Sequence, residues 1–521
     1  MADEPLLRDR PGNHRFGSID PDSAHVQNMT RKNFTKSLLF SIFACVIGSS
    51  YQFGFNTGVL NAPQKVIEKF INETYTNQTG HEIQESTLTL LWSITVSIYC
   101  IGGMIGGFAA GYLCNGFGRK RTMLANILLN IVAGVMAVLS KYFGGYELLI
   151  AGRFMMGINC GISTGVAPLY LSEIAPTNLR GTSGTINQFA IVVGILVAQV
   201  LGLKQILGTS DLWPYLVGTT LIPSVIQLLC LPCCPETPQY LMVAKGDRAA
   251  AEKALIYLRQ THNVQEELDV IEEEYEKLKS ETKLGIRDLF RVSSLRQPLL
   301  ISVMMMLSQQ LSGINAVVYY STSIFERAGL SIENAQYATL GTSVVNVVMT
   351  FVSAVLIDHL GRRTLHLHGL GGMLICTCII SVGLLWQNQW PWASYICIAG
   401  IMLYFVAFAI GPGSIPWFYV AELFSQSPRA PAVAVAVLVN WFANFLVGFG
   451  FPVIQKTLEN YAFVPFLILL GLFWTYTYIK APETKNRSIE EITAIFRDKD
   501  DLPGYSRLTN NKGNDEIVKN V

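Results

Sequence analysis

The sequence predicts an all-α membrane protein with twelve transmembrane helices in two six-helix repeats, joined by cytoplasmic linker helices. The first observation is composition: 50% of the 521 residues are hydrophobic and only 14% are charged, whereas a soluble chain carries about 25% charged residues. The second is a series of apolar runs of about 20 residues, the length that crosses a bilayer core. The third is a set of short motifs that occurs once in each half of the chain.

The apolar runs fall into two groups of six, separated by a polar stretch. The expected spans are 37–60, 88–113, 122–140, 147–170, 184–204, 213–232, 298–323, 336–357, 365–386, 393–421, 431–454 and 460–480. They divide the chain into a tail (1–36), a first half (37–232), a helical linker (233–297), a second half (298–480) and a second tail (481–521). Runs of this length with few charges are typical of transmembrane helices.

Basic residues in the short loops set the orientation. Residues 119–121 follow the second span, residues 362–363 follow the eighth, and the linker from 245 to 296 is also rich in lysine and arginine. All three segments fall on one side, which the positive-inside rule assigns to the cytoplasm. Both termini then lie in the cytoplasm, and the first apolar run is expected to act as an uncleaved signal anchor.

The loop after the first span lies on the opposite, external side in this orientation. It carries two N-glycosylation sequons, Asn72-Glu-Thr and Asn77-Gln-Thr. We expect glycosylation in this loop, and the sequence leaves open which of the two asparagines is used.

Three motifs recur in the two halves at nearly one offset. GRKR at 118–121 corresponds to GRR at 361–363, 243 residues later (118 to 361). Glu173 corresponds to Glu422, 249 residues later, and PET at 235–237 corresponds to PET at 482–484, 247 residues later. Duplicated six-span halves favour a central pathway that opens alternately to each side of the membrane.

The repeated motifs place arginines and glutamates at one depth on the cytoplasmic side. We expect charge pairs among them to latch this face while the external side is open. The residues assigned to this latch are Arg119, Glu173, Arg180, Glu236, Arg362, Arg363, Glu422, Arg429 and Glu483. The alternative is simple positive-inside anchoring, which needs no carboxylate partners.

Several longer motifs together resemble one family. They are FGFNTGVLNAP (53–63), GRFMMG (152–157), PETPQ (235–239), QQLSGIN (309–315), GPGSIPW (411–417) and PETK (482–485). In order and spacing they resemble the sugar porters of the major facilitator superfamily, and closely the facilitative glucose transporters of animals. The similarity covers about residues 34–497. It implies the major facilitator fold and transport of a hexose, with glucose the first candidate, across the plasma membrane.

A hexose site needs side chains that both donate and accept hydrogen bonds, and a flat apolar surface. The resemblance implies that amides in the spans bind the sugar hydroxyls: Gln188, Gln309, Gln310, Asn315, Asn346 and Asn444. It also implies aromatic and apolar contacts from Trp417, Trp441, Phe408, Ile191 and Ile195. The alternative is that such amides only bond neighbouring helices.

Two glycine-containing segments are expected to interrupt helices. Gln310 and Asn315 lie about 140° apart on a regular helix, so both reach one ligand only if Gly313 loosens the helix between them. The segment 411–416 contains two glycines and two prolines. We interpret it as a gating hinge, and the alternative is close packing by small residues.

Residues that could couple transport to protons are replaced in this chain. The proton-coupled relatives carry an aspartate where Asn56 stands, and some glucose transporters carry a glutamate where Ala409 stands. Arg153 remains as a charged residue inside a span. Because an intramembrane titratable group is the usual requirement for ion coupling, we expect uniport driven by the sugar gradient, with a proton-coupled sugar or polyol symporter as the alternative.

Two departures from the family pattern limit the substrate assignment. Met306 precedes Leu-Ser where glucose-selective transporters tend to have glutamine, which leaves fructose and galactose open as substrates. Gln239 replaces the arginine usual after Pro-Glu-Thr-Pro, which removes one charge from the cytoplasmic latch.

Other function classes find little support in the sequence. The net charge of +1 gives a nucleic-acid partner no electrostatic basis. No carboxylate pair, metal-ligand cluster or phosphate-binding glycine loop indicates an enzyme, so no cofactor and no metal are expected. A sugar receptor that does not transport is the remaining alternative. The expected partners are the hexose and the lipid bilayer, and the oligomeric state is left open.

Overall fold

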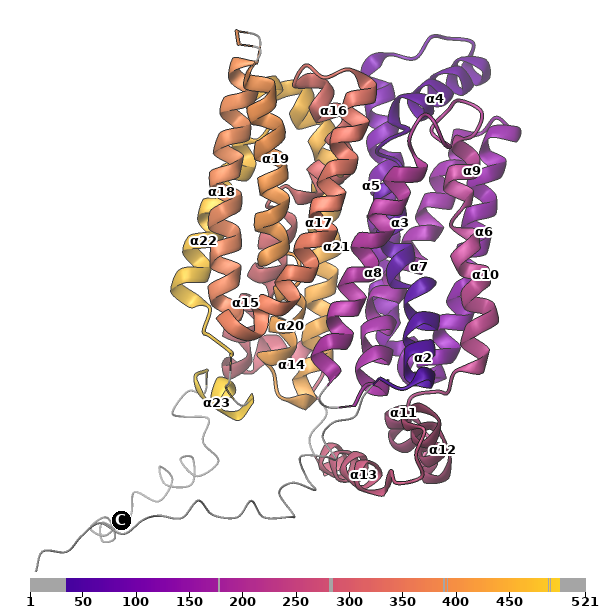
Figure 1. Cartoon of the computed structure of the whole chain (residues 1–521), viewed down its shortest axis with the longest axis vertical. Helices are drawn as coiled ribbons and strands as arrows, with labels where there is room; N and C mark the ends of the chain where they lie inside the picture. The colour runs from indigo at the N-terminus through magenta and orange to yellow at the C-terminus, as the bar shows by residue number, and fades with distance from the viewer. Residues whose placement is uncertain are drawn as a thin grey trace, which may run out of the picture.

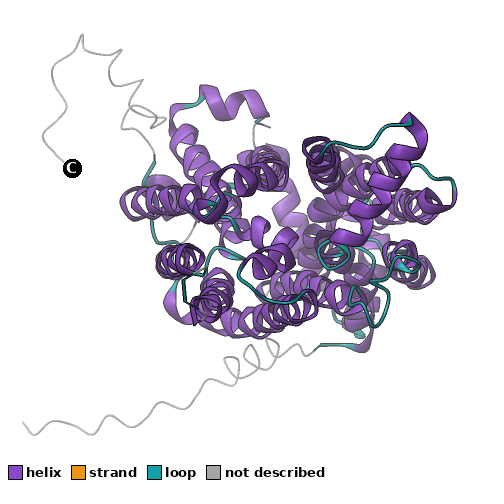
Figure 2. Cartoon of the chain, turned by 90° about the horizontal axis from the view of Figure 1, so that it is seen from above, coloured by secondary structure: helices purple, strands orange, loops and turns teal. Residues whose placement is uncertain are grey.

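The computed structural model describes residues 34–496 except 177–178, 281–283, 388, 391, 486 and 488. Within these ranges every regular element is an α-helix or a short 3-10 helix. Figure 1 shows two groups of long helices side by side, and Figure 2 shows the same groups end-on. The all-α fold predicted from the sequence is confirmed.

The first half contains six spans, of which the first and the last are each interrupted. Its helices are α2 (Lys36–Ile47), α3 (Ser50–Gly58), α5 (Glu85–Phe117), α6 (Arg119–Tyr142), α7 (Tyr146–Ile174), α8 (Arg180–Leu201), α9 (Trp213–Gly218), α10 (Leu221–Cys230) and η2 (Leu231–Cys233). Helix α4 (Gln64–Thr79) lies beyond the spans. Thr35 starts α2 because its hydroxyl accepts a hydrogen bond from the backbone N–H of Leu38.

The second half repeats this plan with interruptions in its first and fourth spans. Its helices are α15 (Ser293–Gln310), α16 (Ile314–Arg327), α17 (Ile332–Leu360), α18 (Arg362–Trp386), α19 (Trp392–Ile410), α20 (Ile415–Glu422), α21 (Gln426–Leu458), η3 (Glu459–Tyr461) and α22 (Val464–Lys480). Four short helices connect the halves and one follows them: α11 (Pro238–Val243), α12 (Arg248–Arg259), α13 (Gln265–Ser280), α14 (Ile286–Arg291) and α23 (Ile489–Ala494).

The helices are long and apolar enough for a multi-pass membrane protein. Among the described residues, eleven spans reach the length and hydropathy that a bilayer requires, some of them made of two helices, and Val464–Lys480 is a shorter apolar helix in the twelfth position. Large apolar side chains point outward along the spans, among them Leu128, Leu229, Ile375, Ile468 and Leu472. A soluble monomer rarely exposes so much apolar surface.

The molecule has two ends, which we name by their helices. At the α4 end lie α4, the carboxyl end of α16 and the start of α17; at the linker end lie α11, α12, α13 and α23 (Figure 1). The halves meet where α5 contacts α21, α8 contacts α17 and α3 contacts α16. These three contacts form the boundary on which any opening movement between the halves must act.

Candidate functional site

A break in the seventh span brings two predicted ligands together. Helix α15 ends at Gln310 and α16 begins at Ile314, and between them Gly313 has a φ of 98°. A Cβ at Gly313 would lie 2.8 Å from the ring of Phe466, so this turn requires glycine for two reasons. The amide of Asn315 donates a hydrogen bond to the Gln310 side-chain oxygen. The expected loosening of the helix at Gly313 is confirmed.

The amides of Gln309, Gln310 and Asn440 form a closed network that is buried. Gln309 Oε1 accepts hydrogen bonds from Gln310 Nε2 (3.1 Å) and from Asn440 Nδ2 (2.7 Å). Gln310 Nε2 also donates to Asn440 Oδ1 at 3.0 Å. Asn440 was not among the residues expected from the sequence. We call the four side chains Gln309, Gln310, Asn315 and Asn440 the amide network.

The break in the tenth span faces this network. Helix α19 ends at Ile410 and α20 begins at Ile415. Gln309 Nε2 donates to the carbonyl oxygens of Pro412 and Gly413, both at 2.8 Å. In return, the Tyr404 hydroxyl donates to the carbonyl oxygen of Ser312, at 2.7 Å, in the break of the seventh span. Each broken span therefore donates hydrogen bonds to backbone carbonyl oxygens in the break of the other span. Inside a membrane, backbone groups outside a regular helix need such partners within the protein.

The predicted aromatic residues belong to α19, α20 and α21. Trp441 is 2% exposed and extends from the second half to the first, where its ring meets Phe53 and Tyr99 edge-on at centroid distances of 5.5 and 5.6 Å. Trp417 is half-buried against the cluster around Met306. Phe408 is half-buried and packs beside Gly413, whose carbonyl oxygen binds Gln309.

The remaining predicted ligands lie near the boundary between the halves. Asn444 Oδ1 accepts a hydrogen bond from the Tyr319 hydroxyl at 2.8 Å. Asn346 is buried on α17, and Gln188 is half-buried on α8. Among the described side chains, no hydrogen bond joins Asn346 or Gln188 to the amide network. The structure thus gathers part of the predicted set and leaves the rest on neighbouring helices.

Ile191 and Ile195 also belong to α8, and their backbone packs against α3. The close approach depends on Gly54 and Gly58: a Cβ at Gly54 would meet the Ile191 carbonyl oxygen at 1.8 Å. The side chain of Ile195 is 8% exposed and belongs to the central core cluster. Both residues are therefore fixed in position by the contact between α3 and α8.

Arg153 is a fully buried cation whose hydrogen-bond partner is backbone. Its Nη1 donates to the carbonyl oxygen of Asn56 at 2.9 Å, and its guanidinium stacks over the Tyr99 ring at 4.6 Å from the centroid. The Asn56 amide donates to the carbonyl oxygen of Gln52. Among the described residues no carboxylate forms an ion pair with Arg153, so the ring face of Tyr99 provides its main electrostatic partner.

At the linker end, two arginine–glutamate pairs form, each within one half of the chain. Arg119 Nη2 lies 2.7 Å from Glu173 Oε1 in the first half, and Arg362 Nε lies 3.2 Å from Glu422 Oε1 in the second. Arg429 donates to the carbonyl oxygen of Phe424 at 3.1 and 3.3 Å. The side chain of Arg180 lies outside the described residues.

Glu236 and Glu483 bind backbone at the starts of two long helices. The Glu236 carboxylate accepts from the N–H groups of Arg119 and Lys120 at 3.0 Å, and Glu483 accepts from those of Arg362, Arg363 and Thr364 at 2.9 to 3.4 Å. Carboxylates are stabilised at helix N-termini. Burial alone would raise the pKa of Glu483, but the backbone donors outweigh it and hold that pKa below its usual value.

Several hydrogen bonds of one linker-end assembly recur at the equivalent residues of the other. Tyr170 donates from its hydroxyl to the carbonyl oxygen of Pro235, and Tyr419 does the same to Pro482. The glycines that precede α6 and α18, Gly118 and Gly361, have φ values of 96° and 91°. The internal repeat inferred from sequence motifs is thus visible in side-chain geometry.

At the α4 end, hydrogen bonds join the two halves directly. The Asn61 amide donates to the Val318 carbonyl oxygen and the Ser321 hydroxyl, both at 2.7 Å, and accepts from the Thr322 N–H at 3.3 Å. Ser343 donates to Gln199 Oε1 at 2.6 Å. Helix α4 carries Asn72 and Asn77, both exposed. The α4 end is therefore closed by contacts between the halves.

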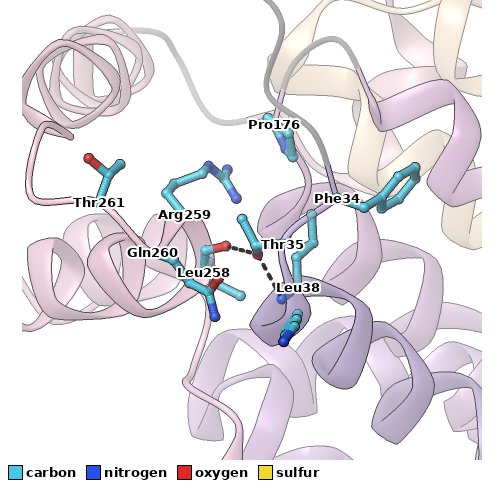
Figure 3. A pocket seen from close by; sticks show the side chains of 9 residues that line it. Phe34, Thr35, Leu38, Pro176, Leu258, Arg259, Gln260 and Thr261 are labelled. Carbon is cyan, nitrogen blue, oxygen red and sulfur yellow. Dashed lines mark hydrogen bonds between the residues drawn. The ribbon is translucent and has the colours of Figure 1, made fainter.

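A separate pocket of about 350 Å³ lies at the linker end, between the start of α2, Pro176 and the end of α12 (Figure 3). Thr35 donates to the Leu258 carbonyl oxygen there, and Arg259 pairs with Glu267 at 2.6 Å and donates to the Ile174 carbonyl oxygen at 2.8 Å. These bonds attach α12 and α13 to the first half. The pocket is not lined by any residue of the amide network; it lies where the linker helices attach to the first half.

Comparison with known proteins gives one family. A family model described as sugar (and other) transporter matches residues 41–496. The facilitated glucose transporter member 3 of solute carrier family 2 from Ovis aries is 47% identical over 462 residues, which cover 89% of this chain and 93% of the relative. Its counterpart from Homo sapiens is 45% identical over 491 residues, covering 94% and 97%.

Solved structures agree with this result. The proton:xylose symporter XylE bound to 6-bromo-6-deoxy-D-glucose superposes with a TM-score of 0.73 at 25% identity, covering 89% of this chain and all of that one. The inward open conformation of the xylose transporter XylE from E. coli gives a TM-score of 0.72, also at 25% identity, over 88% of this chain and all of that one. The chain belongs to the sugar transporter family, with the major facilitator fold.

Proposed function

We propose that the chain is a facilitative hexose uniporter, with D-glucose as the first substrate, and that the sugar binds at the amide network. The observation that carries the proposal is a buried group of amides placed where two broken spans face each other. The relatives named as facilitated glucose transporters, at 45–47% identity over most of the chain, support the same substrate class.

The chemistry of the network suits a neutral polyol. Each amide offers both a donor and an acceptor, so a sugar hydroxyl can replace one amide–amide hydrogen bond without leaving either partner unpaired. Trp417, Trp441 and Phe408 supply aromatic faces for the C–H surface of the ring. Asn346, Asn444 and Gln188 complete the proposed ligand set, with Ile191 and Ile195 as apolar wall.

Transport requires the site to open at one end at a time. The α4 end is closed by the Asn61 contacts, so the state described here would release sugar toward the linker end. The breaks at Gly313 and at 411–414 are the proposed hinges, because their backbone is held by side chains that can exchange partners. The pairs Arg119–Glu173 and Arg362–Glu422, with Arg363, Arg429 and Arg180, remain the proposed latch at the linker end.

The placement in the cell follows from the basic loops. We propose a plasma-membrane protein with the linker end and both termini in the cytoplasm, and with α4 outside, where Asn72 or Asn77 carries the glycan. The proposed units are the tail to residue 36, the halves 37–232 and 298–480, the linker 233–297 and the tail from 481.

Uptake by purified protein in liposomes tests the proposal. Radiolabelled D-glucose should enter down its gradient at a rate unchanged by an imposed proton gradient, and D-galactose and D-fructose should be compared as competitors. Uptake that requires the proton gradient would identify a symporter instead. Saturable binding without any uptake would identify a receptor, and absence of both would refute the proposal.

A further inference from the structure

Three lysine–carboxylate ion pairs join the two halves at the α4 end. Lys65 pairs with Glu326, Lys204 with Glu333 at 3.8 Å, and Lys456 with Glu85 at 3.1 Å. In each pair one residue belongs to the first half or α4 and the other to the second half. None of these residues is part of the motifs that the sequence analysis assigned to gating.

The three pairs are distributed over the whole boundary between the halves. The first pair joins α4 to α16 (Lys65–Glu326). The second joins the segment after α8 to α17 (Lys204–Glu333), and the third joins α21 to α5 (Lys456–Glu85). Each of the three interhelical contacts that hold the halves together thus has one ion pair at its α4 end. At the linker end, by contrast, Arg119–Glu173 and Arg362–Glu422 each lie within one half.

We propose that these three pairs form a clamp that holds the α4 end closed and sets how often the site opens there. The inference rests on the proposed alternating transport and concerns the control of the same site. Lys65–Glu326 is the main member, because the Glu326 side chain is only 17% exposed, although that of Lys65 is 59% exposed. The other two pairs are more than 45% exposed on both sides, so solvent and salt weaken them.

A clamp of this kind must be weak enough to release. Exposed ion pairs contribute little individually, so no single pair locks the transporter, while together they favour one arrangement of the halves. Reversing one charge replaces attraction with repulsion across the boundary. Reversing both charges of a pair restores the attraction, which separates a role in closure from a role in folding.

Distance measurements between spin labels on the full chain in lipid nanodiscs, without sugar, provide the test. Labels at Phe143→Cys and Trp390→Cys report the two halves at the α4 end, since both positions are exposed, and Cys233 and Cys378, the exposed native cysteines, are changed to serine. Lys65→Glu and Glu326→Lys should each raise the ratio of long to short separations about fivefold. The double variant Lys65→Glu/Glu326→Lys should return it close to the starting value.

The matched control is Lys69 and Glu73, which pair at 3.7 Å within α4 itself and are both exposed. Lys69→Glu should leave the distances unchanged. The clamp is refuted if Lys65→Glu behaves like this control, or if the charge-swapped variant opens as far as either single variant. Because the distances are measured without sugar, a failure of glucose uptake would overturn the proposed substrate and leave this result standing.

Discussion

At the scale of single residues, the amide network is the feature with the most direct chemical meaning. Three of its members were predicted as ligands from a motif in one span, and the fourth was not. Asn440 and Asn444 are four residues apart on α21 and therefore share a face. That spacing was available in the sequence, but only packing reveals that Asn440 meets Gln309 and Gln310.

Asn440→Ala is expected to weaken sugar binding. It removes one of the two hydrogen bonds at Gln309 Oε1 and one of the two at Gln310 Nε2, and a lost hydrogen bond costs about 0.5–1.5 kcal/mol. The KM for glucose should rise roughly tenfold, measured as uptake into liposomes. Asn130→Ala is the control, since that amide bonds only Thr220 and Ser224 within the first half; an equal rise in its KM would contradict the assignment.

Asn56→Asp is expected to make uptake depend on pH. The new carboxylate would lie beside Arg153, a buried cation that forms no ion pair with a described carboxylate, and would add the titratable group that proton coupling requires. Uptake should change between pH 5.5 and 7.5, whereas the parent protein should show a flat profile. A flat profile for the variant, with protein still folded, would exclude this position as the determinant of uniport.

At the scale of elements, the broken spans show what a single sequence can and cannot predict. The breaks at Gly313 and at 411–414 follow from glycine and proline. The breaks between α2 and α3 and between α9 and α10 were not predicted, because other spans enable them: Gln227 donates to the carbonyl oxygens of Ala44 and Cys45, and Asn130 donates to that of Thr220. A sequence does not reveal which distant amide will pair with the backbone of a given span.

Gly313→Ala should impair both stability and transport. An alanine with φ near 98° is strained by about 1–2 kcal/mol, and its Cβ would collide with Phe466. Thermal unfolding in detergent should shift down by several degrees, with uptake reduced more than the amount of folded protein explains. Gly111→Ala is the control, because nothing lies within 4 Å of a Cβ there, and it should leave both readouts unchanged.

Glu483→Gln should remove an acid-sensitive contribution to stability. The pKa of Glu483 is held below the ordinary 4.5 in the folded protein, so protons bind the unfolded chain more readily. Its stabilising effect is full above about pH 4.5 and is lost as the pH falls through the lowered pKa. The melting temperature of the variant should therefore differ from that of the parent at pH 6, and the difference should shrink as the pH falls below 4.5. Glu266→Gln, at an exposed position, should show no such convergence.

At the scale of the whole molecule, the internal repeat is clear at the linker end, whereas the proposed sugar-binding residues do not follow it. Glu236 and Glu483 occupy equivalent caps, whereas the amide network belongs entirely to the second half. The fold class and twelve spans were predictable because composition and length determine them. The pairing of helices across the boundary was not predictable, because the apolar periodicity of a span does not indicate which helix that span will contact.

The strict repeat predicts equal effects from equivalent substitutions. Glu236→Gln and Glu483→Gln should each lower the melting temperature by a similar amount, of order 1–3 °C. Neither substitution should change the KM for glucose, because both carboxylates bind the backbone at the starts of α6 and α18 at the linker end and form no hydrogen bond with the amide network. A large difference between the two melting temperatures would show that the halves are not mechanically equivalent.

The different placement of ion pairs at the two ends has a consequence for how such sequences diverge. At the linker end, Arg119 and Arg362 are each balanced by a glutamate of their own half, so each half can change at these pairs without the other. Lys65, Lys204 and Lys456 are balanced across the boundary, so a reversed charge at one of them favours a matching change in the opposite half. Among homologous sequences, positions 65 and 326 should therefore covary, while 119 should covary with 173 and not with 422.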